Sequence, residues 1–178
     1  MTALVAATAA FLITHFVAST PLRAKLALIG LGFLVACEAD IVDHSFEFDA
    51  LSDSPGIEIL DHRYGDSKFP GASNPEDMLK AGKPQQRAGI TGAMKRPASL
   101  YVKWRVLSED RVYEDTVDLR RRLPRDITHR KVYFMVRGPQ LYVYLIDLDQ
   151  RRPPDVPRDG PRVYQDYKVL RIYPDQAK

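Results

Sequence analysis

The residues best suited to acid–base chemistry beyond position 37 are three histidines: His44, His62 and His129. Two of them directly follow an aspartate, Asp43 and Asp61, and a carboxylate that holds an imidazole is a common part of general-base sites. Neighbouring residues on a strand point to opposite faces, so neither pair can meet if these segments are strands. We therefore expect ordinary surface histidines and no enzyme activity.

The other chemical motifs are weaker still. Gly89-Ile-Thr-Gly92 lacks the serine elbow of a hydrolase, and no glycine-rich phosphate loop is present. The single cysteine of the chain excludes a Cys-x-x-Cys metal or redox site. Four acids lie close together but lack the glycine and terminal glutamate of a calcium loop: Asp40, Asp43, Glu47 and Asp49. We expect no metal, no cofactor and no small-molecule substrate.

A basic cluster is the strongest candidate for binding. Its members surround Leu123-Pro124: Arg120, Arg121, Arg122, Arg125, Arg130 and Lys131. All nine tyrosines lie beyond residue 62, and arginine and tyrosine are the residue types that carry binding hot spots. Such a cluster fits an acidic protein, lipopolysaccharide phosphates or anionic lipid headgroups. The alternative is a solvated loop whose arginines pair with nearby acids, namely Glu114, Asp115, Asp118 and Asp126.

Charge divides the 178-residue chain at Cys37. Residues 1–36 hold 25 of the 80 hydrophobic residues, no acid, and only Arg23 and Lys25 as charged groups. An eleven-residue apolar run, residues 26–36, follows these two bases and ends at Leu34-Val35-Ala36-Cys37. A basic region, a short apolar run and small residues at a cleavage point are typical of a secretory signal. The run is too short to cross a bilayer as a helix.

This arrangement, over residues 22–38, resembles the signal of bacterial lipoproteins, whose lipobox ends in the cysteine that becomes lipidated. The resemblance implies cleavage after Ala36, diacylglycerol on the Cys37 sulfur and acylation of the new N-terminus. In that family aspartate after the cysteine favours the inner membrane. Glu38 stands there in this chain, so the resemblance implies a lipid anchor in the outer membrane, facing the periplasm. Export makes nucleic acid an unsuitable partner.

Residues 1–20 do not fit this signal, because they carry an apolar run of their own. One interpretation is an additional membrane helix followed by a basic turn. The other, which we favour, is that translation starts near Val17.

The remaining chain has an acidic part and a basic part. Residues 38–61 hold eight acids and no Lys or Arg, whereas residues 62–178 have a net charge of +9. We expect residues 37–61 to form an acidic tether with one or two strands, Ile41–Phe48 and Ile57–Leu60, and residues 62–178 to form the folded domain. Glycines and prolines between residues 65 and 98 predict a long loop with one short helix, capped by Asn74 and closed by Gly82.

From Ser99 onward the pattern is that of β structure. Alternating or β-branched and aromatic segments predict strands at residues 100–107, 111–119, 131–137, 141–148 and 162–173. The proline-rich residues 151–161 should cross the surface in an extended form. The fold class is therefore mainly β, an antiparallel sandwich or open barrel with one short helix.

Gly89-x-x-Gly92 leading to Leu100-Tyr-Val-Lys-Trp-Arg105 resembles small lipoproteins associated with type VI secretion loci, over residues 89–148. Some of these are immunity proteins, which implies a module that neutralises a secreted toxin by binding it. Two functions therefore follow from the sequence: a lipid-anchored binding protein with a protein partner, or a structural lipoprotein of an envelope or secretion complex.

Overall fold

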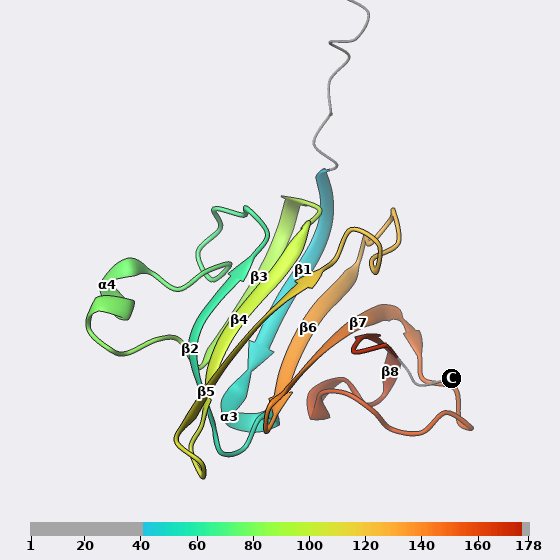
Figure 1. Cartoon of the computed structure of the whole chain (residues 1–178). Helices are drawn as coiled ribbons and strands as arrows, with labels where there is room; N and C mark the ends of the chain where they lie inside the picture. The colour runs from blue at the N-terminus through green and yellow to red at the C-terminus, as the bar shows by residue number, and fades with distance from the viewer. Residues whose placement is uncertain (1–40, 176–178) are drawn as a thin grey trace, which may run out of the picture. The chain divides into compact units, whose positions relative to one another are not determined.

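The computed structural model describes residues 41–175, which form a sandwich of two β-sheets (Figure 1). The larger sheet has the order β3 (Arg87–Lys95), β1 (Ile41–Asp49), β6 (Arg130–Arg137), β7 (Gln140–Arg151) and β8 (Tyr167–Tyr173). The smaller sheet has the order β2 (Ile57–Tyr64), β4 (Ser99–Val106) and β5 (Arg111–Asp118). Every neighbouring pair is antiparallel except β1 and β6, which run parallel. Of the two predicted architectures, sandwich or open barrel, the sandwich is the one observed, and the mainly β class is confirmed.

The short helices differ in part from the prediction. The expected helix is present as α4 (Glu76–Lys80), but its N-cap is Pro75, which has no side-chain acceptor for the helix N–H groups. Asn74 is instead buried, and its side chain is used elsewhere. Two further turns lie within the described residues, α3 (Ala50–Asp53) and the 3-10 turn η2 (Arg162–Tyr164).

The expected acidic tether is part of the sandwich from residue 41 onward. β1 lies in the interior of the larger sheet, between β3 and β6, and the side chains of Phe46 and Phe48 are 0% and 1% exposed. The acids of this strand, Asp43, Glu47 and Asp49, alternate with those rings and therefore face away from the core. Their charge reflects the outer face of a strand, and not a domain boundary at residue 62.

The long loop predicted before residue 98 contains a complete strand, β3. Its glycines are tolerated because β3 is the edge strand of its sheet, where pairing on one side only leaves more conformational freedom. Gly92 has a φ of +150°, and a Cβ on Gly89 would lie 3.7 Å from Cγ of Glu47. Counting glycines and prolines without considering sheet position led to the wrong prediction for these residues.

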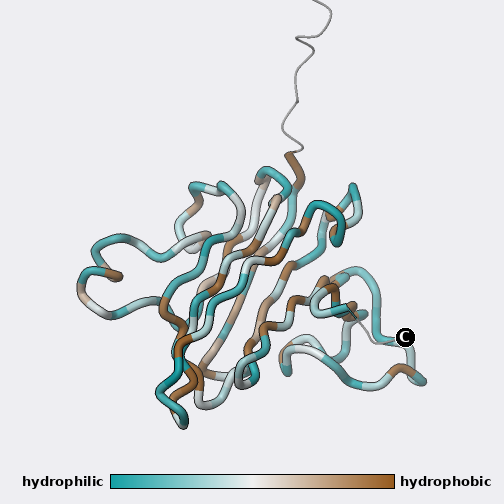
Figure 2. Tube along the Cα trace, in the orientation of Figure 1, coloured by the Kyte–Doolittle hydropathy of each residue, from teal (hydrophilic) through white to brown (hydrophobic). Residues whose placement is uncertain are grey.

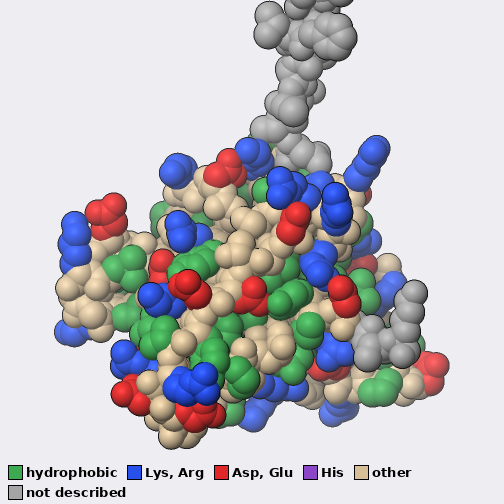
Figure 3. Space-filling model, viewed as in Figure 1, with side chains coloured by type: hydrophobic (Ala, Val, Ile, Leu, Met, Phe, Trp, Pro, Cys, Tyr) green, Lys and Arg blue, Asp and Glu red, His purple; other side chains and the backbone are tan. Residues whose placement is uncertain are grey.

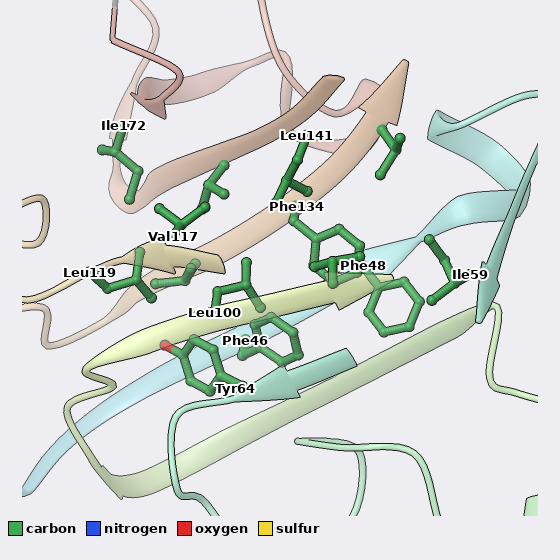
Figure 4. Packing of buried hydrophobic residues seen from close by; sticks show 14 of the residues in the cluster. Phe46, Phe48, Ile59, Tyr64, Leu100, Val117, Leu119, Phe134, Leu141 and Ile172 are labelled. Atoms are coloured by element: carbon green, nitrogen blue, oxygen red, sulfur yellow. The ribbon is translucent and has the colours of Figure 1, made fainter. Parts of the chain in front are cut away.

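Aromatic rings hold the two sheets together (Figure 4). The ring centroids of Phe46 and Tyr64 are 4.1 Å apart, those of Phe48 and Phe134 4.5 Å, and those of Phe48 and His62 4.7 Å. These residues come from β1, β2 and β6, so the stack joins both sheets. Coloured by hydropathy, the strands carry most of the apolar positions and the loops most of the polar ones (Figure 2).

The predicted signal segment, Cys37 and the alternative start at Val17 all lie outside the described residues. Within residues 41–175, no helix is long and apolar enough to cross a membrane.

The place of β1 in the core can be tested with two truncations in neighbouring segments. Phe48→Ala should lower the free energy of unfolding by about 3–5 kcal/mol, because it removes a fully buried ring. Leu51→Ala, whose side chain is 66% exposed, should change it by less than about 0.5 kcal/mol. Urea unfolding followed by circular dichroism measures both. Similar small effects for the two variants would contradict the integrated position of β1.

Candidate functional site

The three histidines lie in three different settings. His44 and His62 are 1% and 0% exposed, so the expectation of surface histidines was wrong for both. His129 is exposed, has a φ of +56°, and places Nδ1 3.4 Å from Oδ2 of Asp149. Each histidine contacts different residues, and the structure does not bring the three rings together.

His62 fastens the loop between β2 and β3. Its Nε2 lies 3.1 Å from the carbonyl oxygen of Gly71, which can only accept, so Nε2 carries the proton. Nδ1 is then an acceptor and takes a bond from the Asn74 amide at 3.2 Å. The Asn74 oxygen accepts from the backbone N–H of Gln85 at 2.7 Å, which fixes the amide in this orientation. The imidazole is thus held neutral by a closed set of bonds.

His44 has fewer partners. Its Nδ1 donates to the carbonyl of Val42 at 2.8 Å, while Nε2 is buried without a hydrogen-bond partner among the described residues. The nearby Tyr64 hydroxyl is also buried without a hydrogen-bond partner among the described residues. The ring centroids of His44 and Tyr64 are 5.9 Å apart. Burial lowers the pKa of both His44 and His62 and raises the pKa of Tyr64.

The outer face of the larger sheet is half covered. Residues 152–166, here called the cover segment, lie over β7 and β8 and enclose a second apolar cluster around Tyr133, Met135, Tyr144 and Ile146. The hydroxyl of Tyr144 donates to Asp159 at 3.2 Å, and a Cβ on Gly160 would lie 2.9 Å from Val169. The close approach at Gly160 excludes a larger residue there without rearrangement.

Asp53 anchors this cover segment. Its carboxylate accepts from the Tyr133 hydroxyl at 2.8 Å and from the backbone N–H of Arg162 at 3.0 Å. Burial, followed by the bond to Asp53, raises the pKa of Tyr133. Sequence reasoning missed this role, because Asp53 was assigned to a tether and its partners lie about a hundred positions away.

A row of three polar side chains marks where the cover segment ends. Glu47 accepts from both Lys131 Nζ and the Tyr164 hydroxyl, and Lys131 also contacts that hydroxyl. Burial alone would lower the pKa of Lys131, but its bonds to Glu47 and Tyr164 outweigh this and raise it. Lys131 also lies 4.6 Å from the Tyr164 ring centroid.

Beyond this row lies the outer face of β1 and β3, which we call the open face. Its β3 residues are exposed, whereas Ser45 on β1 is buried. It consists of four cross-strand pairs: Asp43–Ala93, Ser45–Thr91, Glu47–Gly89 and Asp49–Arg87. Ser45 and Thr91 share a hydrogen bond of 2.9 Å, and Arg87 lies 3.3 Å from Asp49. Small side chains on β3 leave the face nearly flat.

A depression lies at each end of the open face. The first, about 400 Å³, is lined mainly by Glu47, Asp49 and Arg87. The second, about 270 Å³, is lined by residues of β1 and β3 together with Leu148, His129 and Asp149. Both are wide and open, and apolar atoms make up more than half of the lining of each. A wide, open depression suits contact with the side chains of a protein better than enclosure of a small ligand.

The six predicted binding residues do not form one surface. Lys131 points to the outer face of the sheet, while Arg130, its neighbour on β6, points to the opposite side and lies 3.4 Å from Asp147. Arg120 pairs with Asp118, and Arg122 pairs with Asp175 and donates to the carbonyl of Ile172 at 2.8 Å. Arg121 and Arg125 are exposed and make no ion pair with any residue of the described range. Whether these residues bind a partner remains a prediction.

No three His, Cys, Asp or Glu side chains within residues 41–175 are arranged to hold a metal ion. Of the four acids considered as ligands, Asp40 lies outside this range. Asp49 and Glu47 are engaged by Arg87 and Lys131, respectively.

No family model, curated protein or solved structure matches the chain.

The buried histidines predict a loss of stability in weak acid. Because the pKa of each is lower in the folded protein than the usual 6.5, the unfolded chain binds protons first as the pH falls below that value. The free energy of unfolding should therefore be constant above about pH 7. It should fall below pH 6.5 by up to about 1.4 kcal/mol per pH unit for each histidine. Urea midpoints between pH 7.5 and 5 measure this.

Two variants separate the contributions. His44→Phe replaces a ring with an unpartnered nitrogen by an apolar one and should make the pH dependence shallower. His129→Asn removes an exposed histidine, suits the positive φ, and leaves both buried rings in place, so the acid-induced loss should remain. An unchanged slope in His44→Phe would show that its protonation does not contribute.

Proposed function

We propose that this protein is a lipid-anchored, periplasm-facing binding module that neutralises a secreted toxin by direct contact through its open face. The observation that carries the proposal is the asymmetry of the larger sheet. Its β7–β8 half is covered by residues 152–166, whereas its β1–β3 half exposes a flat, polar surface between two depressions. A flat surface of this kind fits another protein.

The open face combines small side chains on β3 with acidic side chains on β1. Exposed Gly89, Thr91 and Ala93 allow close approach, and Asp43 provides an acceptor for a partner's basic or hydroxyl groups. Glu47 and Asp49, on the same face, are engaged by Lys131 and Arg87. Of the six basic residues predicted from the sequence, Lys131 borders this face. The five arginines lie away from this face, at the end of the domain that holds the loop after β5.

The membrane anchor rests on Leu34-Val35-Ala36-Cys37 and on its resemblance to the lipoprotein signal. The type of target rests on the resemblance to lipoproteins associated with type VI secretion loci. Binding at a folded surface requires neither a cofactor nor a catalytic group, which agrees with the structural use of His44 and His62.

The anchor can be tested by mass spectrometry of the mature N-terminus. We expect Cys37 as the first residue, carrying a diacylglyceryl group and an amide-linked acyl chain, and partition into the detergent phase. Cys37→Ser should abolish the modification, because a hydroxyl replaces the thiol that accepts the diacylglyceryl group. An unmodified cysteine would contradict the proposed localisation.

The binding face can be tested by a matched pair of substitutions in cells attacked by sibling cells. A strain that lacks this protein should lose survival, and the wild-type chain should restore it. Thr91→Arg places a large charged side chain on the open face and should weaken toxin binding by about thirty-fold or more, so that survival is not restored.

Thr116→Arg is the control, because Thr116 is also an exposed threonine on a strand but lies on the outer face of the smaller sheet. Equal protection by the two variants would exclude the open face. Normal survival of the deletion strain, together with an envelope or secretion defect, would favour the structural lipoprotein.

A further inference from the structure

The loop between β5 and β6 lies at the end of the sandwich where the described chain begins. This basic loop, residues 119–129, contains four arginines and one aspartate. It is tied to β1 by the bond from the His129 N–H to the Asp43 carbonyl, 3.1 Å long. The end of β3 contacts it as well, since Arg96 donates to the carbonyls of Leu123 and Pro124 at 3.1 and 3.2 Å.

The first residue of β1 completes this arrangement. Ile41 is paired with Lys95, the last residue of β3, so the start of the domain, the β3–β4 turn and the basic loop share one end (Figure 1). Lys and Arg side chains line this upper rim in the space-filling view (Figure 3).

The basic loop is a rigid part of the fold. Leu119, Leu123 and Ile127 are 0–5% exposed and close the core beneath it. Arg121 and Arg125 are exposed on this loop. Neither forms a salt bridge within residues 41–175, although the charge of Arg121 contributes to the lowered pKa of Asp118. Three acids at this end are engaged by bases, Asp66 by Lys95, Asp118 by Arg120 and Asp147 by Arg130. Asp126, in the loop itself, accepts from the backbone N–H of Thr128.

We propose that this end of the domain, through Arg121 and Arg125, docks against the anionic phospholipid surface to which Cys37 is anchored. The inference rests on the proposed lipidation of Cys37. Only four residue steps separate Cys37 from Ile41, and a fully extended chain spans at most about 3.6 Å per residue. The start of β1 therefore stays within about 14 Å of the anchored cysteine, whatever the path of the chain.

At this distance electrostatic attraction acts on the loop. The screening length is about 8 Å at physiological ionic strength, so cations at the proximal end interact with headgroup phosphates while those at the far end do not. Glu38 and Asp40 offset part of the positive charge, which is why the docking depends on the two unpaired arginines and not on the net charge of the chain. Each basic group near such a surface strengthens its attachment about five-fold.

The test uses the mature, full-length lipoprotein reconstituted in vesicles of phosphatidylcholine, either alone or with phosphatidylglycerol as about 30% of the lipid. Phenylglyoxal modifies accessible arginines, and mass spectrometry gives the rate at each site. With phosphatidylglycerol, Arg121 and Arg125 should react about five-fold more slowly, and high salt should restore the rate. Arg111 and Arg137, at the opposite end, should react at the same rate in both vesicles.

Two double variants provide the matched control. Amine labelling of Lys95 at the proximal end should be slowed by phosphatidylglycerol in the wild type and in Arg111→Gln/Arg137→Gln. This protection should disappear in Arg121→Gln/Arg125→Gln, because both variants lose two positive charges but only one loses them at the docking end.

The outcomes are distinct. Anchored protein with equal labelling in both vesicles overturns the docking and leaves the basic loop for an acidic protein, while the lipid anchor stands. A chain without lipid on Cys37 overturns the anchor of the proposed function and removes the premise of the docking with it.

Discussion

The stack of rings between the sheets is the interaction on which the rest of the structure depends. Phe46 and Phe48 on β1 contact Tyr64 and His62 on β2 and Phe134 on β6, so one strand organises both layers. With its inner face committed in this way, β1 must present its acids outward. The position of β1 thus determines both the core and the chemistry of the open face.

The local patterns of the strands were predictable, whereas their arrangement was not. The strands predicted at residues 100–107 and 111–119 agree with β4 and β5 to within one residue at each end. The mainly β class followed from the same pattern. The place of β1 depends on which strands pair, and no local pattern encodes its parallel pairing with β6. The charge count was misleading because it averaged the two faces of a strand that has phenylalanines on one side and carboxylates on the other.

The residue types of the candidate surfaces could be predicted, but their arrangement in space could not. Arg120 to Lys131 are adjacent in sequence, yet alternation on β6 sends Arg130 and Lys131 to opposite faces, and ion pairs engage Arg120 and Arg122. The buried positions of His44 and His62 follow from the same alternation as Phe46 and Tyr64, since each histidine lies two residues before an inward aromatic residue. That spacing was a usable signal. The role of Asp53 had none, because its partners are distant in the chain.

The parallel pairing of β1 with β6 has a consequence for the order of folding. The contact joins Ser45 to Lys131, so β1, an interior strand of the larger sheet, is synthesised early but gains its second neighbour only after most of the chain is present. Sandwiches dominated by such distant pairings fold in milliseconds to seconds, more slowly than domains with local contacts. A chain exported with its N-terminus leading would therefore remain open while it passes through a translocation channel. Its topology would then delay closure until the last strands have emerged.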